Sequence, residues 1–217
     1  MSDDVTPTPS DSIWTRPIVV PPRLARVARI LGIGLKALGA MMVILFVISL
    51  MFQAYHAWTF RPGARLMLSE HAYLRVPAHF SGTAYDAQDE SDVSKTYILF
   101  PASDTYSGRL ISVDALNPDR PLGFRDPALM AEYARKSDRE VRSPVHFSYS
   151  GLEVTATVVP NLCKARLEGA HSLQMLVDMH GQLVYIQSDS VTLGVADDAE
   201  PRTMAKAAID LLRLTTD

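Results

Sequence analysis

Residues 37–52 read ALGAMMVILFVISLMF, sixteen consecutive residues without a charge and with Ser49 as the only polar side chain. Extended back to Gly34 and forward to Tyr55, the stretch has 22 residues, interrupted by one lysine and one glutamine. A helix of this length measures about 33 Å, which matches the hydrocarbon core of a bilayer at about 30 Å. The run is also longer than a helix in a soluble core needs to be. The sequence therefore predicts one transmembrane helix over residues 34–55.

The flanks of this segment carry side chains that anchor helices at membrane surfaces. Lys36 lies near the inner end, where its long stem lets the amine reach the headgroups. Tyr55 and Trp58 lie at the other end, where amphipathic rings prefer the interface. Three arginines upstream share one broad face that can meet anionic headgroups: Arg23, Arg26 and Arg29. Because Pro22 suits a first helical position, we expect one juxtamembrane and transmembrane helix over 23–58.

A cleaved signal peptide is the main alternative for this segment. Such peptides place a short basic region before an apolar stretch of about 7–15 residues, whereas here more than 30 residues precede the apolar run. The small residues Ala54 and Ala57 make a poor cleavage site because His56 lies between them. We therefore expect an uncleaved signal anchor.

The charges around the segment predict its orientation. Residues 16–36 hold five basic residues and no acidic one, whereas residues 53–70 hold two arginines and one glutamate. Because cytoplasmic flanks are enriched in Lys and Arg, the N-terminus is predicted to lie in the cytoplasm. The chain has 16 Arg and only five Lys, a bias usual for GC-rich bacterial genomes. We expect a cell inner membrane location, with the C-terminal domain in the periplasm.

Residues 1–22 are expected to form a disordered cytoplasmic tail, because they are mostly polar and rich in proline. The tail nevertheless contains a small apolar cluster: Trp14, Ile18, Val19 and Val20. Two interpretations stay open for this cluster. It can contact lipid at the interface, or it can dock as an extended strand on a cytoplasmic partner.

Residues 59–217 are predicted to form one periplasmic α+β domain with a mainly antiparallel sheet and a C-terminal helix. The TFRPG sequence at 59–63 should end the membrane helix. Residues 66–76 fit either a strand or a helix. Period-two patterns and turn dipeptides predict strands elsewhere: 95–100, 108–113, two strands in 144–159 around Ser150-Gly151, and a hairpin of 172–178 with 182–188 around His180-Gly181.

Two helices are predicted in this domain. Asp126 caps the first, over 127–137, with proline at its first position. The second covers 201–215 and should pack on the sheet through one face: Met204, Ala208, Leu211, Leu212 and Thr215.

Composition excludes several classes of protein. The net charge of −3 and the pI near 6.1 give no support to nucleic-acid binding. The single cysteine, Cys163, excludes a disulfide scaffold and a Cys-rich zinc fold, and we expect it to be a buried small hydrophobe. No acidic residue lies within the membrane segment, so nothing there can carry a proton.

Motifs for catalysis or cofactor binding are not evident. Signal peptidases of the Ser-Lys type also have a membrane anchor followed by a β-rich domain. In this chain, however, neither Ser69 nor any lysine after the predicted membrane segment lies in a recognisable motif. The six histidines make no metal-ligand pair. An acidic stretch alternates oxygen donors as calcium loops do but lacks their glycine and glutamate: Asp86, Gln88, Glu90 and Asp92. Phe124, Arg125 and Tyr133 are too sparse for a binding platform. We expect no enzyme activity and no cofactor.

Small residues in the inner half of the predicted helix allow a neighbouring helix to approach closely: Gly34, Ala37, Gly39 and Ala40. We therefore expect contacts with the lipid bilayer and with other membrane-protein subunits. The layout resembles that of the bitopic scaffold subunits of type IV secretion systems, without a shared motif. It predicts a structural or accessory subunit of a secretion- or conjugation-type inner-membrane machine. The alternatives are an accessory subunit of a respiratory or photosynthetic complex, an anchored periplasmic hydrolase, and a periplasmic ligand-binding protein.

Overall fold

A computed structural model describes most of the chain: residues 21–86, 92–102, 109–136, 142–160 and 171–216. The chain divides into two compact units, Met1–Phe52 and Gln53–Asp217. Nearly all of the described part of the first unit belongs to one helix.

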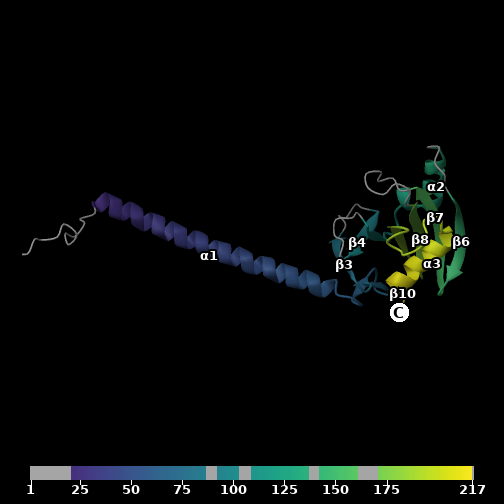
Figure 1. Ribbon diagram of the computed structural model, residues 1–217, viewed down its shortest axis with the longest axis horizontal. Helices are drawn as coiled ribbons and strands as arrows, with labels where there is room; N and C mark the ends of the chain where they lie inside the picture. The colour runs from purple at the N-terminus through teal and green to yellow at the C-terminus, as the bar shows by residue number, and fades with distance from the viewer. Residues whose placement is uncertain (1–20, 87–91, 103–108, 137–141, 161–170, 217) are drawn as a thin grey trace, which may run out of the picture. The chain divides into compact units, whose positions relative to one another are not determined.

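The helix α1 runs without a break from Pro22 to Thr59 (Figure 1). Its 38 residues correspond to about 57 Å, longer than the predicted span by the juxtamembrane turns that precede it. The helix begins at the predicted proline, whose missing N–H costs nothing at a first helical position. It ends where the Thr59 hydroxyl donates to the Tyr55 carbonyl at 2.9 Å, shortly before Pro62 prevents further helical pairing.

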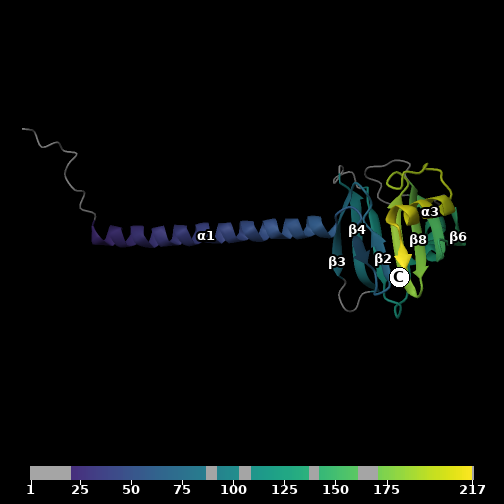
Figure 2. The same cartoon turned by 90° about the horizontal axis from the view of Figure 1, so that it is seen from below.

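The second unit is built on a seven-stranded sheet of order β3-β4-β5-β9-β8-β7-β6, in which all neighbours are antiparallel (Figures 1 and 2). The predicted α+β class with a mainly antiparallel sheet is therefore confirmed. The strands are β3 (Phe80–Asp86), β4 (Val93–Pro101), β5 (Ile111–Leu116), β6 (Arg142–Tyr149), β7 (Leu152–Pro160), β8 (His171–Met179) and β9 (Gln182–Asp189).

Both predicted hairpins are confirmed. Tyr149 pairs with Leu152 and Met179 pairs with Gln182, so each loop has two residues. The four loop residues all have positive φ, as a type I′ turn requires: Ser150 (52°), Gly151 (79°), His180 (56°) and Gly181 (94°). The period-two patterns and the two turn dipeptides were together enough to locate these strands.

Two other strands depart from the prediction. The strand expected at 108–113 lies at 111–116, and β3 was not predicted at all. β3 contains small residues and exposes its last three, so it lacks the alternation that marks a half-buried strand.

A second, three-stranded sheet has the order β1-β2-β10, with bounds Arg65–Met67, Ala72–Arg75 and Thr215–Thr216. The stretch 66–76, which fitted a strand or a helix, therefore forms a strand pair. The Tyr97 hydroxyl donates to the Met67 carbonyl at 2.7 Å and joins the two sheets.

Helix α2 (Pro127–Lys136) begins as predicted, because the Asp126 carboxylate accepts the Ala128 N–H at 2.8 Å. A short 3-10 helix, η2 (Gly123–Arg125), precedes it. Helix α3 (Pro201–Leu212) is shorter than the predicted 201–215, since the chain turns at Arg213 and Thr215 joins β10.

The face of α3 also needs a correction. Leu211 is only half-buried, whereas Ala205 and Ile209 are buried in the core. The buried face of α3 is thus rotated by about one residue from the face that the sequence predicted.

The sheet is covered on both faces. Residues of β7 that point to alternate sides, such as Val158 and Thr157, are both fully buried. On one face α3 and the smaller sheet close the main core, in which Met204 and Leu212 pack against strands β6 to β8. On the other face η2 and α2 lie over the sheet.

Candidate functional site

The apolar side chains of α1 are uncovered. Every large apolar side chain from Leu24 to Trp58 is between 47% and 72% exposed. The most apolar 18-residue window of the helix has no buried residue, and α1 is long and apolar enough to cross a membrane. An exposed apolar surface of this extent is typical of helices that contact a membrane or other proteins.

The small residues of α1 do not all share one side. At 100° per residue, Gly34, Ala37 and Ala40 follow one another within about 120°, whereas Gly39 lies about 140° from Gly34. Gly39 instead shares its side with Gly32, seven residues earlier. A Cβ built on Gly34 or Gly39 meets nothing within 4 Å, so larger side chains at these positions would not disturb this chain. The helix therefore presents two small-sided stripes.

The predicted interface residues are all described and lie on α1. The four basic side chains fall within about 140° of one another around the axis: Arg23, Arg26, Arg29 and Lys36. At the other end Tyr55 and Trp58 are 69% and 68% exposed. Trp58 has a partner that the sequence analysis missed, since the Arg61 guanidinium lies 3.6 Å from its ring centroid. The spacing of three residues could have indicated this cation–π pair.

The junction between α1 and the sheet is closed by Phe60. Its side chain is 4% exposed and belongs to the main core. A Cβ on Gly82 would lie 2.8 Å from the Phe60 ring and 2.8 Å from the Ile98 carbonyl oxygen. Glycine at 82 therefore makes room for Phe60 against β3.

The linker after Phe60 is paired to the end of β2. The Gly63 N–H donates to the Val76 carbonyl at 2.8 Å, and the Val76 N–H donates to the Ala64 carbonyl at 2.9 Å. Arg65 and Arg75 both approach Tyr73, with guanidinium carbons 4.5 Å and 6.0 Å from its ring centroid. Several arginines are thereby gathered within a few residues of the helix end.

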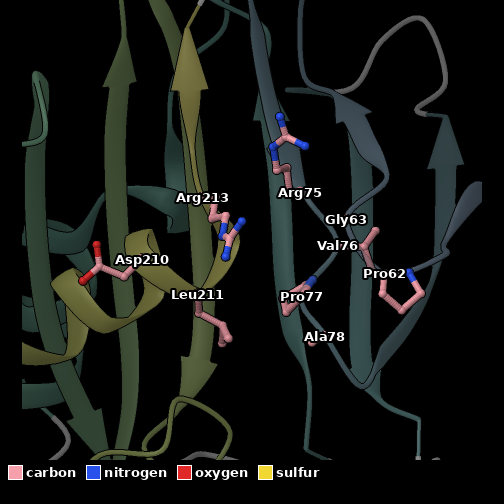
Figure 3. A pocket seen from close by; sticks show the side chains of 9 residues that line it. All are labelled: Pro62, Gly63, Arg75, Val76, Pro77, Ala78, Asp210, Leu211 and Arg213. Carbon is pink, nitrogen blue, oxygen red and sulfur yellow. The ribbon is translucent and has the colours of Figure 1, made fainter.

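A pocket of about 370 Å³ opens beside this linker (Figure 3). It lies between the linker, the end of β2 and the end of α3, and its lining is Pro62, Gly63, Arg75, Val76, Pro77, Ala78, Asp210, Leu211 and Arg213. The sequence analysis missed this pocket because Arg75 and Arg213 are far apart in the chain. Only the pairing of β10 with β2 brings them together.

On the other face of the sheet, Arg125 joins two carboxylates. Its Nε donates to Asp114 Oδ2 at 2.8 Å and its Nη1 pairs with Asp92. Asp114 is 6% exposed and also accepts the Thr96 hydroxyl at 2.7 Å. Burial raises the pKa of nearby Tyr185, and the negative charge of Asp114 adds to this. The arrangement holds η2 on the sheet.

The acidic stretch from Asp86 to Asp92, which was compared with a calcium loop, is only partly described. Asp86 pairs with Lys95 at 3.6 Å and Asp92 pairs with Arg125, whereas Gln88 and Glu90 lie outside the described residues. Within the described ranges no group of three His, Cys, Asp or Glu side chains is placed to hold a metal ion. Phe124 and Tyr133 stack edge-to-face with centroids 6.5 Å apart.

Several predicted positions lie outside the described part of the chain: Trp14, Ile18, Val19, Val20 and Cys163. Their roles stay predictions. The sequence matches no protein-family model, and no curated protein matches it.

Proposed function

We propose that the protein is a single-pass inner-membrane subunit of a bacterial multiprotein complex, structural or accessory, that acts through protein–protein contacts. A secretion- or conjugation-type machine fits the layout best. The observation that carries this proposal is α1, a 38-residue helix whose large apolar side chains are all exposed. Its two small-sided stripes offer close approach to neighbouring helices, and Phe60 ties its end to a folded domain.

The proposed orientation places the N-terminus in the cytoplasm and the sheet domain in the periplasm. It rests on the five basic residues of 16–36 and on the aromatic residues at the other end. In a Cys163→Ser background, a cysteine at Ser10 should resist a membrane-impermeant thiol reagent applied from the periplasm, and one at Arg120 should react. Labelling of position 10 but not of position 120 would contradict this orientation.

Native purification from membranes, followed by sizing and mass spectrometry, tests the role in a complex. We expect other membrane subunits to co-purify with the wild-type chain. Ala37→Ile and Gly39→Ile should each reduce their recovery several-fold, because a bulky side chain on either stripe keeps a neighbouring helix away. Leu35→Ile is the matched control in the same turns. A monomer with hydrolytic activity, or full recovery with both variants, would contradict the proposal.

A further inference from the structure

The two arginines of the pocket come from opposite ends of the domain. Thr215 pairs with Tyr73 and Thr216 with Ala72, so β10 brings the turn that holds Arg213 beside β2, which ends at Arg75, and both residues line the pocket. Like charges gathered in one pocket repel each other. Figure 3 shows both side chains at the pocket between β2 and the turn after α3.

No carboxylate within the described ranges compensates these charges. Neither guanidinium makes a salt bridge with a described residue. Asp210, the single acidic residue of the lining, points away from both arginines (Figure 3) and accepts the Tyr149 hydroxyl at 3.0 Å. The polar side of the pocket therefore carries the positive charge of the two guanidinium groups.

The backbone at Arg213 adopts an unfavourable conformation. This residue ends α3 with φ at 46°, the left-handed conformation in which glycine is usual. Its N–H donates to the Ile209 carbonyl, a bond that glycine would make equally well. The cap therefore does not require an arginine, and the side chain is left to line the pocket.

We propose that this pocket binds a phosphate group, and that in the membrane this is the phosphodiester of a glycerophospholipid. Arginine forks match the paired oxygens of phosphate, and two of them would exchange mutual repulsion for charge-assisted hydrogen bonds. Val76, Ala78 and Leu211 supply an apolar wall, which suits a ligand that joins a phosphate to a glycerol and acyl chain.

The position of the pocket favours a lipid. Pro62 of the lining lies three residues after the end of α1, so their Cα atoms are at most about 11 Å apart. If Trp58 lies at the headgroup level, the pocket is within reach of the same layer. This step rests on the proposed membrane anchoring, whereas recognition of phosphate itself does not.

The test uses the full chain in a neutral detergent. Phosphatidylglycerol and diacylglycerol are titrated by native mass spectrometry, and inorganic phosphate is titrated by thermal shift. The test variant is Arg75→Gln/Arg213→Gln, and Arg120→Gln/Arg135→Gln removes two exposed arginines elsewhere as a charge-matched control. We expect the test variant to bind phosphatidylglycerol at least about tenfold more weakly than wild type does. The control variant should bind it as wild type does, and all three proteins should bind diacylglycerol weakly.

Stability without ligand gives an independent readout. The single variant Arg75→Gln should raise the Tm of the lipid-free chain, because it removes the repulsion, and should abolish the shift caused by phosphate. A phosphate shift that needs the arginines, without a preference for phosphatidylglycerol, would support phosphate binding and overturn the lipid as its source. Equal binding by test and control variants would overturn the proposal entirely. Loss of the chain from the membrane fraction would contradict the anchoring instead.

Discussion

At the scale of single residues, Gly82 is the one described glycine at which an added Cβ would meet other atoms within 4 Å. Its backbone lies where β3, β4 and the linker after α1 converge, and a Cβ there would lie 2.6 Å from the Leu99 side chain. The Ile98 carbonyl oxygen, at 2.8 Å, belongs to the paired strand and cannot rotate aside. The absence of a side chain is therefore a packing requirement at this position.

Gly82→Ala should lower the free energy of unfolding by about 1–3 kcal/mol, because the added methyl group forces Phe60 or the strand pair apart. Urea unfolding of the detergent-solubilised chain, followed by circular dichroism, measures the change. Thr83→Ala at the next, half-buried position is the control and should change little. Equal stability of Gly82→Ala and wild type would mean that Phe60 does not pack as described.

Asp197 is the residue whose ionisation matters most to the loop before α3. Its Oδ1 accepts both the His171 N–H and the Ser190 hydroxyl at 2.8 Å. Partial burial alone would raise the pKa of Asp197, but these hydrogen bonds to its charged form outweigh burial and hold the pKa below its ordinary value. The folded state therefore favours the ionised carboxylate.

Because this pKa is depressed on folding, the stabilisation is present above the unfolded value of about 4 and is lost as the pH falls through the folded value. Asp197→Ala should cost about 1 kcal/mol at pH 7. Thermal melts of both proteins between pH 7 and pH 3 should show the difference shrinking below about pH 4. A difference that is constant over this range would show that the charge of Asp197 contributes nothing.

At the scale of elements, one ion pair network fastens η2 and the start of α2 to the sheet. Arg125 is the link, and Asp114, buried on β5, is its deepest partner. Burial alone would lower the pKa of Arg125, but Asp114 and Asp92 raise it, so the guanidinium stays charged in its half-buried position. A buried carboxylate of this kind is costly once its partner is removed.

Arg125→Met should therefore destabilise the protein by about 2–3 kcal/mol, less than a fully buried pair because Arg125 is 28% exposed. In an Asp114→Asn background the same change should cost less than half as much, since no buried charge is left behind. Denaturant melts of the four proteins complete the double-mutant cycle. Equal costs in both backgrounds would show that the two residues are not coupled.

The elements were predictable from sequence where local chemistry decides them. The two hairpins followed from Ser150-Gly151 and His180-Gly181, because a two-residue turn with positive φ specifies its own strands. Helix α2 followed from Asp126 and Pro127, which cap it without outside help. β3 and β10 were not predictable from their own side chains. These strands are held in place by pairing with their neighbours in the sheets.

At the scale of the whole molecule, residues 60–217 should fold without α1. The core of this part is continuous across both sheets and α3, and it includes Phe60. We expect the fragment to be soluble and to melt in one cooperative transition by circular dichroism. Phe60→Ala in the fragment should cost about 3 kcal/mol. A fragment without a cooperative transition would show that the domain needs its partners or its anchor to fold.

The sequence by itself determined the long apolar helix, its start at Pro22 and its end before Pro62, and the antiparallel α+β character of the rest. These follow from composition and from residues close together in the chain. Only the tertiary structure decided that Phe60 packs in the main core and that Arg75 and Arg213, from opposite ends of the domain, line one pocket. The charge of such a site depends on which strands pair, and that is set by the packing of the whole domain and not by any local pattern.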